Sequence, residues 1–91
     1  MEHRADIAFL SSSAVTGLTA YHQNEDVIRA KRAMMHSAEK TIFLSDHTKF
    51  CRNALTKFSD LDQFDHVFVD KSISETDKAY LIENGVNISL V

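Results

Sequence analysis

The stretch Thr41-Ile42-Phe43-Leu44-Ser45-Asp46 decides the fold of this chain. Its first four residues are β-branched or apolar, which is typical of a buried strand, and Ser45-Asp46 ends the run with polar groups. Similar runs occur before it, at Ile7-Ala8-Phe9-Leu10, and after it, at His66-Val67-Phe68-Val69. Because continuous apolar runs of this length are typical of parallel sheets, the three stretches predict strands of one such sheet.

Amphipathic patterns between these runs predict helices. Asn24 is a good helix cap, and Glu25 and Asp26 then place negative charge in the first turn, where the helix dipole favours it. Ser74 and Asn84-Gly85 predict the start and the end of a later helix. The apolar faces expected for the two helices are Val27, Ala30, Met34 and Ala38 for the first, and Ala79 and Ile82 for the second.

Three further segments complete the pattern. Phe50, Ala54 and Phe58 recur at every fourth position, which favours a short helix. Residues 14–23 show few periodic positions and are predicted to form a loop. Residues 86–91 alternate apolar and polar side chains and therefore predict a fourth strand.

The alternation of strands and helices along the chain predicts an α/β domain. We expect a parallel sheet of about four strands with helices on both faces of the sheet. The length of 91 residues fits one small domain or part of a larger one. The first strand starts almost at Met1, so it has no preceding partner in the chain and its apolar edge should invite pairing.

Charge and composition exclude several functions. The formal net charge is −3 and the pI is near 5.9, whereas a domain that holds duplex DNA by itself is usually basic. No apolar run is long enough to span a bilayer, so no membrane role is expected. The single cysteine, Cys51, cannot form an internal disulfide and favours the cytoplasm. The histidines and Cys51 lack metal-ligand spacing, and neither a metal nor another cofactor is predicted.

Polar residues follow the second predicted strand directly. Ligands of open α/β sheets bind at the carboxyl ends of the strands. This rule directs attention to Ser11-Ser12-Ser13 and Asp70-Lys71, which follow two other predicted strands, and above all to Asp46 and Lys49. The carboxylate can accept hydrogen bonds from sugar hydroxyls, and the ammonium can meet a phosphate oxygen. The alternative is that Asp46 caps the following turn and that Lys49 is a solvated surface charge.

Weaker candidates lie between the first strand and the first helix and on that helix. Gly17 offers a backbone that a ligand can approach closely, and Thr19 places a hydroxyl beside it. The alternative for both is a plain turn. Lys31 lies within the predicted helix, where most such side chains are simply solvated.

Several short motifs follow one another along essentially the whole chain. They are Ala5–Leu10, Gly17-Leu18-Thr19, Lys31-Arg32-Ala33-Met34, Asp46-His47-Thr48-Lys49-Phe50, Phe64–Asp70 and Asn84–Ile88. In this order they resemble the C-terminal part of the sensor domain of DeoR-type bacterial transcriptional repressors, the DeoR/GlpR family, in which the second, third and fourth motifs read GLT, KRAM and DxSKF. His47 and Thr48 stand where the family has small serines.

This resemblance implies an isomerase-like α/β sensor fold, related to ribose-5-phosphate isomerase and the CoA transferases. Members bind a phosphorylated sugar or polyol, which relieves repression of a catabolic operon, and they usually form homo-oligomers. By the same resemblance, Asp46 and Lys49 are the acid and the base of the effector site, and Gly17, Thr19 and Lys31 are lesser ligand-binding candidates.

The resemblance covers only part of such a repressor. The winged helix-turn-helix and the first half of the sensor have no counterpart in residues 1–91, so we expect a fragment that reaches operator DNA only through a missing domain. A small sugar-phosphate isomerase-like enzyme is one alternative. No glycine-rich loop supplies its phosphate cradle, so the chain is predicted not to be an enzyme. A remnant or oligomerisation module without a ligand is the other alternative.

Overall fold

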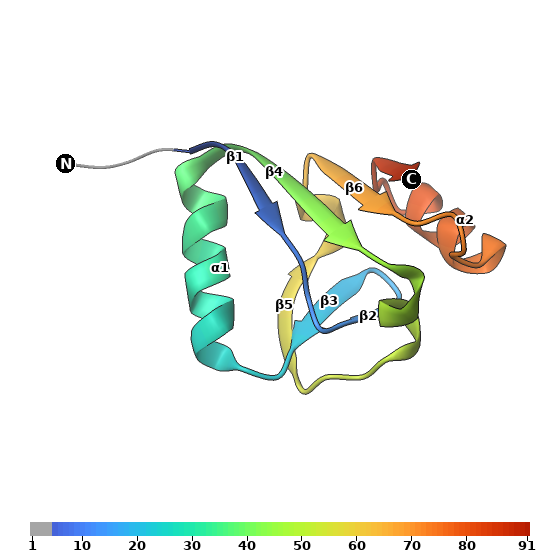
Figure 1. The fold of residues 1–91 in the computed structure, drawn as a ribbon, viewed down its shortest axis with the longest axis horizontal. Coiled ribbons are helices and arrows are strands. Elements are labelled where there is room, and N and C mark those ends of the chain that lie inside the picture. The colour runs from blue at the N-terminus through green and yellow to red at the C-terminus, as the bar shows by residue number, and fades with distance from the viewer. Residues whose placement is uncertain (1–4) are drawn as a thin grey trace.

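Two sheets and two α-helices make up residues 5–91, the part of the chain that the structure, a computed structural model, describes (Figure 1). The larger sheet has four parallel strands in the order β1-β4-β6-β7. Its strands are β1 (Ala5–Leu10), β4 (Ala38–Ser45), β6 (His66–Val69) and β7 (Ile88–Leu90). The predicted parallel sheet is therefore confirmed, and the run that begins at Thr41 lies in a central strand.

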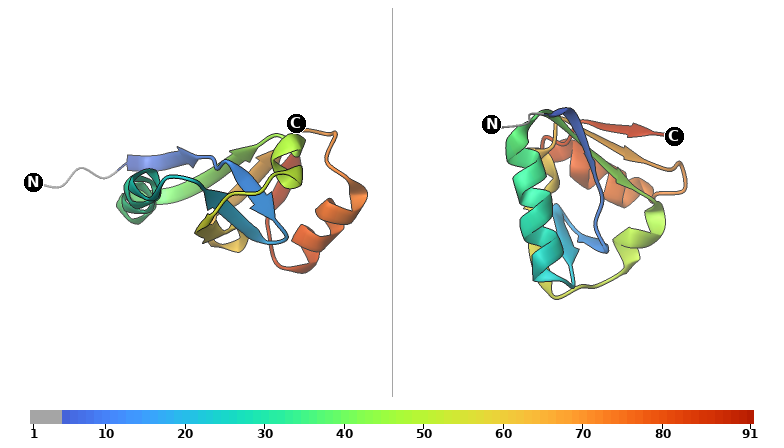
Figure 2. Two further views of the ribbon diagram at one scale, coloured as in Figure 1. Left: turned by 90° about the horizontal axis from the view of Figure 1, so that it is seen from below. Right: turned by 60° about the vertical axis from the view of Figure 1, so that its left-hand side comes forward.

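The two faces of this sheet have different surroundings. On the inner face, Leu10, Phe43 and Val67 are aligned across three strands and are buried in the core. On the outer face, Phe9 and Leu44 are 58% and 42% exposed. Both helices and the smaller sheet lie on the inner side (Figure 2). We expected helices on both faces of the sheet. In the described chain both helices lie on the inner face, and the apolar side chains on the outer face are exposed.

Residues 14–22 form a β-hairpin where a loop was predicted. Strands β2 (Ala14–Thr16) and β3 (Thr19–His22) pair antiparallel, and Thr16 is directly opposite Thr19. Gly17 occupies the first of the two turn positions with a φ of +58°, and Leu18 has no positive φ, which is the φ pattern of a type II′ hairpin turn. Glycine adopts this conformation without strain, so the turn gives the hairpin its sharp reversal.

The third strand of the smaller sheet is β5 (Thr56–Asp60), which pairs antiparallel with β3. The short helix predicted for residues 50–58 is therefore wrong. Phe50 lies in the 3-10 helix η1 (His47–Cys51), and Phe58 is a buried core residue of β5. Pairing with β3 decides the conformation of this segment, and the four-residue spacing of its apolar side chains does not.

The ends of both α-helices follow the sequence signals. In α1 (Glu25–Ser37), the Asn24 side chain accepts hydrogen bonds from the amides of Asp26 and Val27. In α2 (Glu75–Glu83), the Ser74 hydroxyl accepts from the amide of Asp77, and Gly85 follows the helix with a φ of +82°. The predicted caps are thus confirmed. Within residues 5–91, neither helix has the length and apolar character that crossing a membrane requires.

The helix faces that were predicted to be buried are exposed, except for Ala38, which is half-buried and belongs to β4. In α1 the buried residue is Ile28, with Met35 packed against the core, while Val27 and Met34 face solvent. In α2 the buried residue is Leu81. The predicted face of α1 contained apolar residues only. The face that packs against the core includes the half-buried Lys31, whose ammonium donates hydrogen bonds to Ser11 and His22.

Candidate functional site

The carboxyl ends of β1 and β4 open into one pocket of about 420 Å³. It lies where the outer face of the parallel sheet meets the edge at which the strands end, as expected for an open α/β sheet. The residues that line it are Ser11, Ser12, Leu44, Ser45, Asp46, Lys49, Phe68 and Val91. The structure therefore brings Asp46 and Lys49 to the same pocket, together with the serines that follow β1.

Asp46 has a capping role as well as a place in the pocket. Its Oδ1 accepts hydrogen bonds from the Thr48 hydroxyl and, at 2.9 Å, from the Thr48 amide, so it begins η1. The hydroxyl of Thr48 is the main reason that the pKa of Asp46 lies below its ordinary value, and the charge of Lys49 lowers it further. Asp46 is exposed and therefore presents a negative charge at neutral pH.

Lys49 lies three residues later in η1 and is partly buried. No salt bridge of the described chain includes Lys49, although its charge is close enough to influence Asp46. An acid and a base thus line one pocket without neutralising each other. This arrangement can bind a ligand that carries both hydroxyl donors and an anionic group.

The turn that carries both residues is held by Asp70, which follows β6. Its carboxylate accepts hydrogen bonds from the His47 amide and, at 2.7 Å, from His47 Nδ1. Burial alone would raise the pKa of Asp70, but the hydrogen bonds and charge of His47 together lower it below its ordinary value. Asp70 was visible in the sequence only as a polar residue at a strand end. Its role in fixing the turn depends on the pairing of β4 with β6.

Two predicted site residues lie outside this pocket. The hydroxyl of Thr19 donates to the carboxylate of Asp60 at 2.7 Å, across the paired strands β3 and β5. Gly17 forms the hairpin turn next to Tyr80 of α2, whose ring would lie 3.6 Å from a Cβ added at the glycine. Neither residue lines the pocket of Asp46 and Lys49, and the contacts of both are structural.

Lys31 also does not line the pocket, but it contacts a residue that does. Its ammonium donates hydrogen bonds to the carbonyl oxygen of Ser11 and to Nε2 of His22, the latter at 2.8 Å. The same nitrogen lies 5.9 Å from the centre of the Phe58 ring, a cation–π distance. Lys31 is therefore engaged within the protein.

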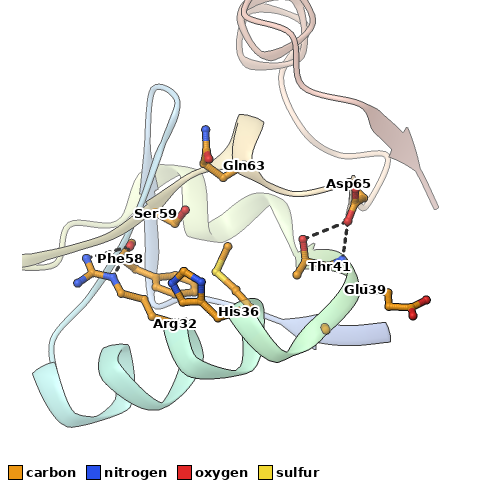
Figure 3. Close-up of a pocket in the computed structure, with 10 residues that line it drawn as sticks. Arg32, His36, Glu39, Thr41, Phe58, Ser59, Gln63 and Asp65 are labelled. Carbon is orange, nitrogen blue, oxygen red and sulfur yellow. Dashed lines mark hydrogen bonds between the residues drawn. The ribbon is translucent and has the colours of Figure 1, made fainter. Parts of the chain in front are cut away.

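A second pocket, of about 350 Å³, lies at the opposite end of β4 (Figure 3). Two of its charged residues already have partners inside the fold. Asp65 accepts from the amide of Thr41 at 2.7 Å, and the guanidinium of Arg32 donates to the carbonyl oxygens of Phe58 and Lys57 at 3.1 Å. The first contact joins β4 to the segment before β6, and the second joins α1 to β5, so the charges of Asp65 and Arg32 serve the packing of the elements.

Within the described residues, no three His, Cys, Asp or Glu side chains gather as they would around a metal ion. The imidazole of His47 is bonded to Asp70, and that of His22 lies between Ser13 and Lys31. The pocket at the strand ends offers a ligand serine hydroxyls, the carboxylate of Asp46 and the ammonium of Lys49.

Comparison with known proteins places these features in a family context. Residues 1–71 match the model of the DeoR C-terminal sensor domain. The chain is 34% identical over 89 residues to a protein of Escherichia coli O157:H7 that is named as an aga operon transcriptional repressor, covering 94% of this chain and 32% of that protein.

Two proteins of Haemophilus influenzae are similar as well. An uncharacterized HTH-type transcriptional regulator is 32% identical over 88 residues, with 94% of this chain and 34% of that protein covered. A glycerol-3-phosphate regulon repressor is 30% identical over 70 residues, with 74% and 27% covered. The chain thus spans about a third of the length of the relatives it matches.

Proposed function

Because this chain belongs to the DeoR C-terminal sensor domain family, we propose that it is the effector-sensing part of a DeoR-type transcriptional repressor of carbohydrate catabolism. Its effector is a phosphorylated sugar or polyol, which binds at the pocket of Asp46 and Lys49. The observation that carries this proposal is that an acid and a base, not paired with each other, line one pocket at the carboxyl edge of the parallel sheet.

The chemistry of the pocket suits such an effector. Asp46 accepts hydrogen bonds from sugar hydroxyls, and the ammonium of Lys49 binds the phosphate as a point charge. Leu44 and Phe68 form an apolar wall against which the carbon skeleton lies. A volume of about 420 Å³ is within the range of small-molecule sites.

The wider function of the proposed repressor follows from its relatives. They are named as transcriptional regulators, and one of them is named for glycerol 3-phosphate, a phosphorylated polyol. In this proposal, operator DNA is contacted by a separate winged helix-turn-helix domain, since the sensor chain carries a net charge of −3. The repressor acts in the cytoplasm as a homo-oligomer, and it catalyses no reaction.

Calorimetric titration tests the effector site. The probes are glycerol 3-phosphate, fructose 1-phosphate, fructose 6-phosphate and inorganic phosphate, with glycerol as the uncharged control. We expect saturable binding of a phosphorylated probe, and Asp46→Asn and Lys49→Ala should each weaken it by at least about tenfold, the worth of a charge-assisted hydrogen bond. Lys40→Ala, at the opposite end of β4, should leave the affinity unchanged.

Other outcomes would separate the alternatives. Conversion of a probe to a product would show that the protein is an enzyme, and the proposed sensor function would then be wrong. Absence of binding to every probe would favour a module without a ligand. Binding that survives both Asp46→Asn and Lys49→Ala would place the effector elsewhere on the molecule.

A further inference from the structure

A polar network joins α1 to the segment that follows β1. Lys31 donates to the carbonyl oxygen of Ser11 and to Nε2 of His22, and Nδ1 of His22 lies 3.0 Å from the hydroxyl oxygen of Ser13. An ammonium group has donors only, so Nε2 of His22 must accept. Its Nδ1 then carries the proton and donates to Ser13. The network thus runs from the Lys31 ammonium to the His22 ring and from the ring to Ser13, with one donor and one acceptor in each contact.

The segment that this network holds is part of the proposed effector pocket. Ser11 and Ser12 both line that pocket, and the hydroxyl of Ser12 is turned to the carbonyl oxygen of Ala14 at 3.0 Å. The amide of Ser13 donates to Tyr21 in the hairpin at 3.1 Å. Residues 11–13 are therefore anchored to the hairpin at one end and to Lys31 at the other.

We propose that Lys31 is a positioning residue for the effector pocket, which holds Ser11 and Ser12 in the pocket wall from the inner side of the sheet without touching the ligand. This inference rests on the proposed function, because it concerns the same pocket. It assigns Lys31 a role different from the direct ligand contact expected from the sequence resemblance.

The electrostatics of the network favour this role near neutral pH. Burial lowers the pKa of His22, and the charge of Lys31 lowers it further, which outweighs the opposite effect of a hydrogen bond with the Ser11 backbone. This direction agrees with the 2.8 Å contact in which Nε2 accepts from Lys31. Without the ammonium, the carbonyl oxygen of Ser11 loses its donor from Lys31, and the segment between β1 and the hairpin gains freedom to move. A ligand would then have to order that segment on binding, and its affinity would fall.

The first test measures binding. Lys31→Met removes the charge and keeps most of the side-chain length, Lys31→Arg keeps the charge and its donors, and Arg29→Met is the matched control. Arg29 lies on the same helix in an exposed ion pair with Asp26. With glycerol 3-phosphate or fructose 6-phosphate as the probe, we expect about tenfold weaker binding for Lys31→Met. Lys31→Arg should restore most of the affinity, and Arg29→Met should match the parent protein.

The second test needs no ligand. Hydrogen exchange of the Ser13 amide should become about tenfold faster in Lys31→Met, because the segment opens locally more often. Exchange of the Leu61 amide, which donates to Leu18 at 2.7 Å, should stay unchanged. The pKa of His22, followed by NMR titration, should rise in Lys31→Met because a neighbouring positive charge is gone. A general loss of stability would not produce this local pattern.

These measurements separate the inference from the function on which it rests. Unchanged Ser13 exchange and an unchanged His22 pKa in Lys31→Met would overturn the positioning role. Complete loss of binding with unchanged exchange would instead make Lys31 a direct ligand contact, which also overturns it. If the parent protein binds none of the phosphorylated probes, the proposed function fails, and exchange and titration still decide whether Lys31 holds the segment.

Discussion

At the scale of single residues, the geometry of the pocket depends on a contact that lies behind it. Asp70 fixes the start of η1 through the amide and the ring of His47, and η1 carries Lys49. Asp46 is turned toward Thr48 on the same short helix. Of the two carboxylates that follow these neighbouring strands, Asp70 holds the turn from behind, whereas Asp46 caps η1 and also lines the pocket.

This division predicts a specific acid sensitivity. The pKa of Asp70 is lowered in the folded chain from its ordinary value of 3.8, so the unfolded chain takes up its proton first as the pH falls. The stabilisation by Asp70 is therefore fully present above pH 3.8 and is lost as the pH falls through the lower folded value. We expect Asp70→Asn to be less stable than the parent at pH 7, and the difference to shrink below pH 3.8.

Urea unfolding at a series of pH values checks this expectation. Asp62→Asn is the control, since Asp62 is exposed and contacts only the side chain of its neighbour Gln63 among the described hydrogen bonds. A stability difference between Asp70→Asn and the parent that stays constant from pH 7 to pH 3 would contradict the assigned role.

At the scale of elements, the central strand β4 separates two environments that a substitution can distinguish. Phe43 is fully buried on the inner face, where its ring packs 5.1 Å from that of Phe64, whereas Phe9 on β1 is 58% exposed on the outer face. We expect Phe43→Ala to cost about 3–5 kcal/mol of unfolding free energy and Phe9→Ala to cost less than about 1 kcal/mol. Chemical denaturation measures both, and equal costs would contradict the assignment of the faces.

The elements also show how far the sequence could predict the fold. The strand around Phe43 and the caps Asn24 and Ser74 were predictable because each depends on residues that are close together in the chain. The hairpin and β5 were not, since β3 is short and gains its stability by pairing with residues about 40 positions away. The buried face of α1 was missed because Lys31 belongs to it, and its partners become visible only in three dimensions.

The candidate site was predictable to a similar degree. The rule that ligands bind at the carboxyl ends of strands pointed to Asp46 and Lys49, and the structure places both in the lining of one pocket. The same rule pointed to the serines after β1 but could not say that Ser11 and Ser12 reach that pocket. Thr19 and Gly17 were weaker candidates. In the structure, Thr19 contacts Asp60 and Gly17 lies beside Tyr80.

At the scale of the whole molecule, the parallel sheet has an edge that the described chain does not cover. Strand β1 is the outermost strand of the order β1-β4-β6-β7, and its side chains Ile7 and Phe9 are exposed. An edge strand with exposed apolar residues is a template for pairing with another strand. We therefore expect the 91-residue chain to self-associate as its concentration rises through the micromolar range.

Sedimentation velocity over a concentration series tests this expectation. Phe9→Lys places a charge on the edge strand and should shift the chain to the monomer. Leu55→Lys is the matched control, because Leu55 is 92% exposed but lies in the loop before β5, away from the parallel sheet. A monodisperse monomer of the parent protein at every concentration would refute the prediction.

One further property follows from the pocket that contains both Ser11 and Val91. Its walls come from segments that are almost a full chain length apart, so no small part of the molecule can assemble it alone. Occupancy is thereby linked to global unfolding as well as to the local opening of residues 11–13. A free ligand concentration of about a hundred times the dissociation constant would raise the unfolding free energy of the whole domain by about 2.7 kcal/mol.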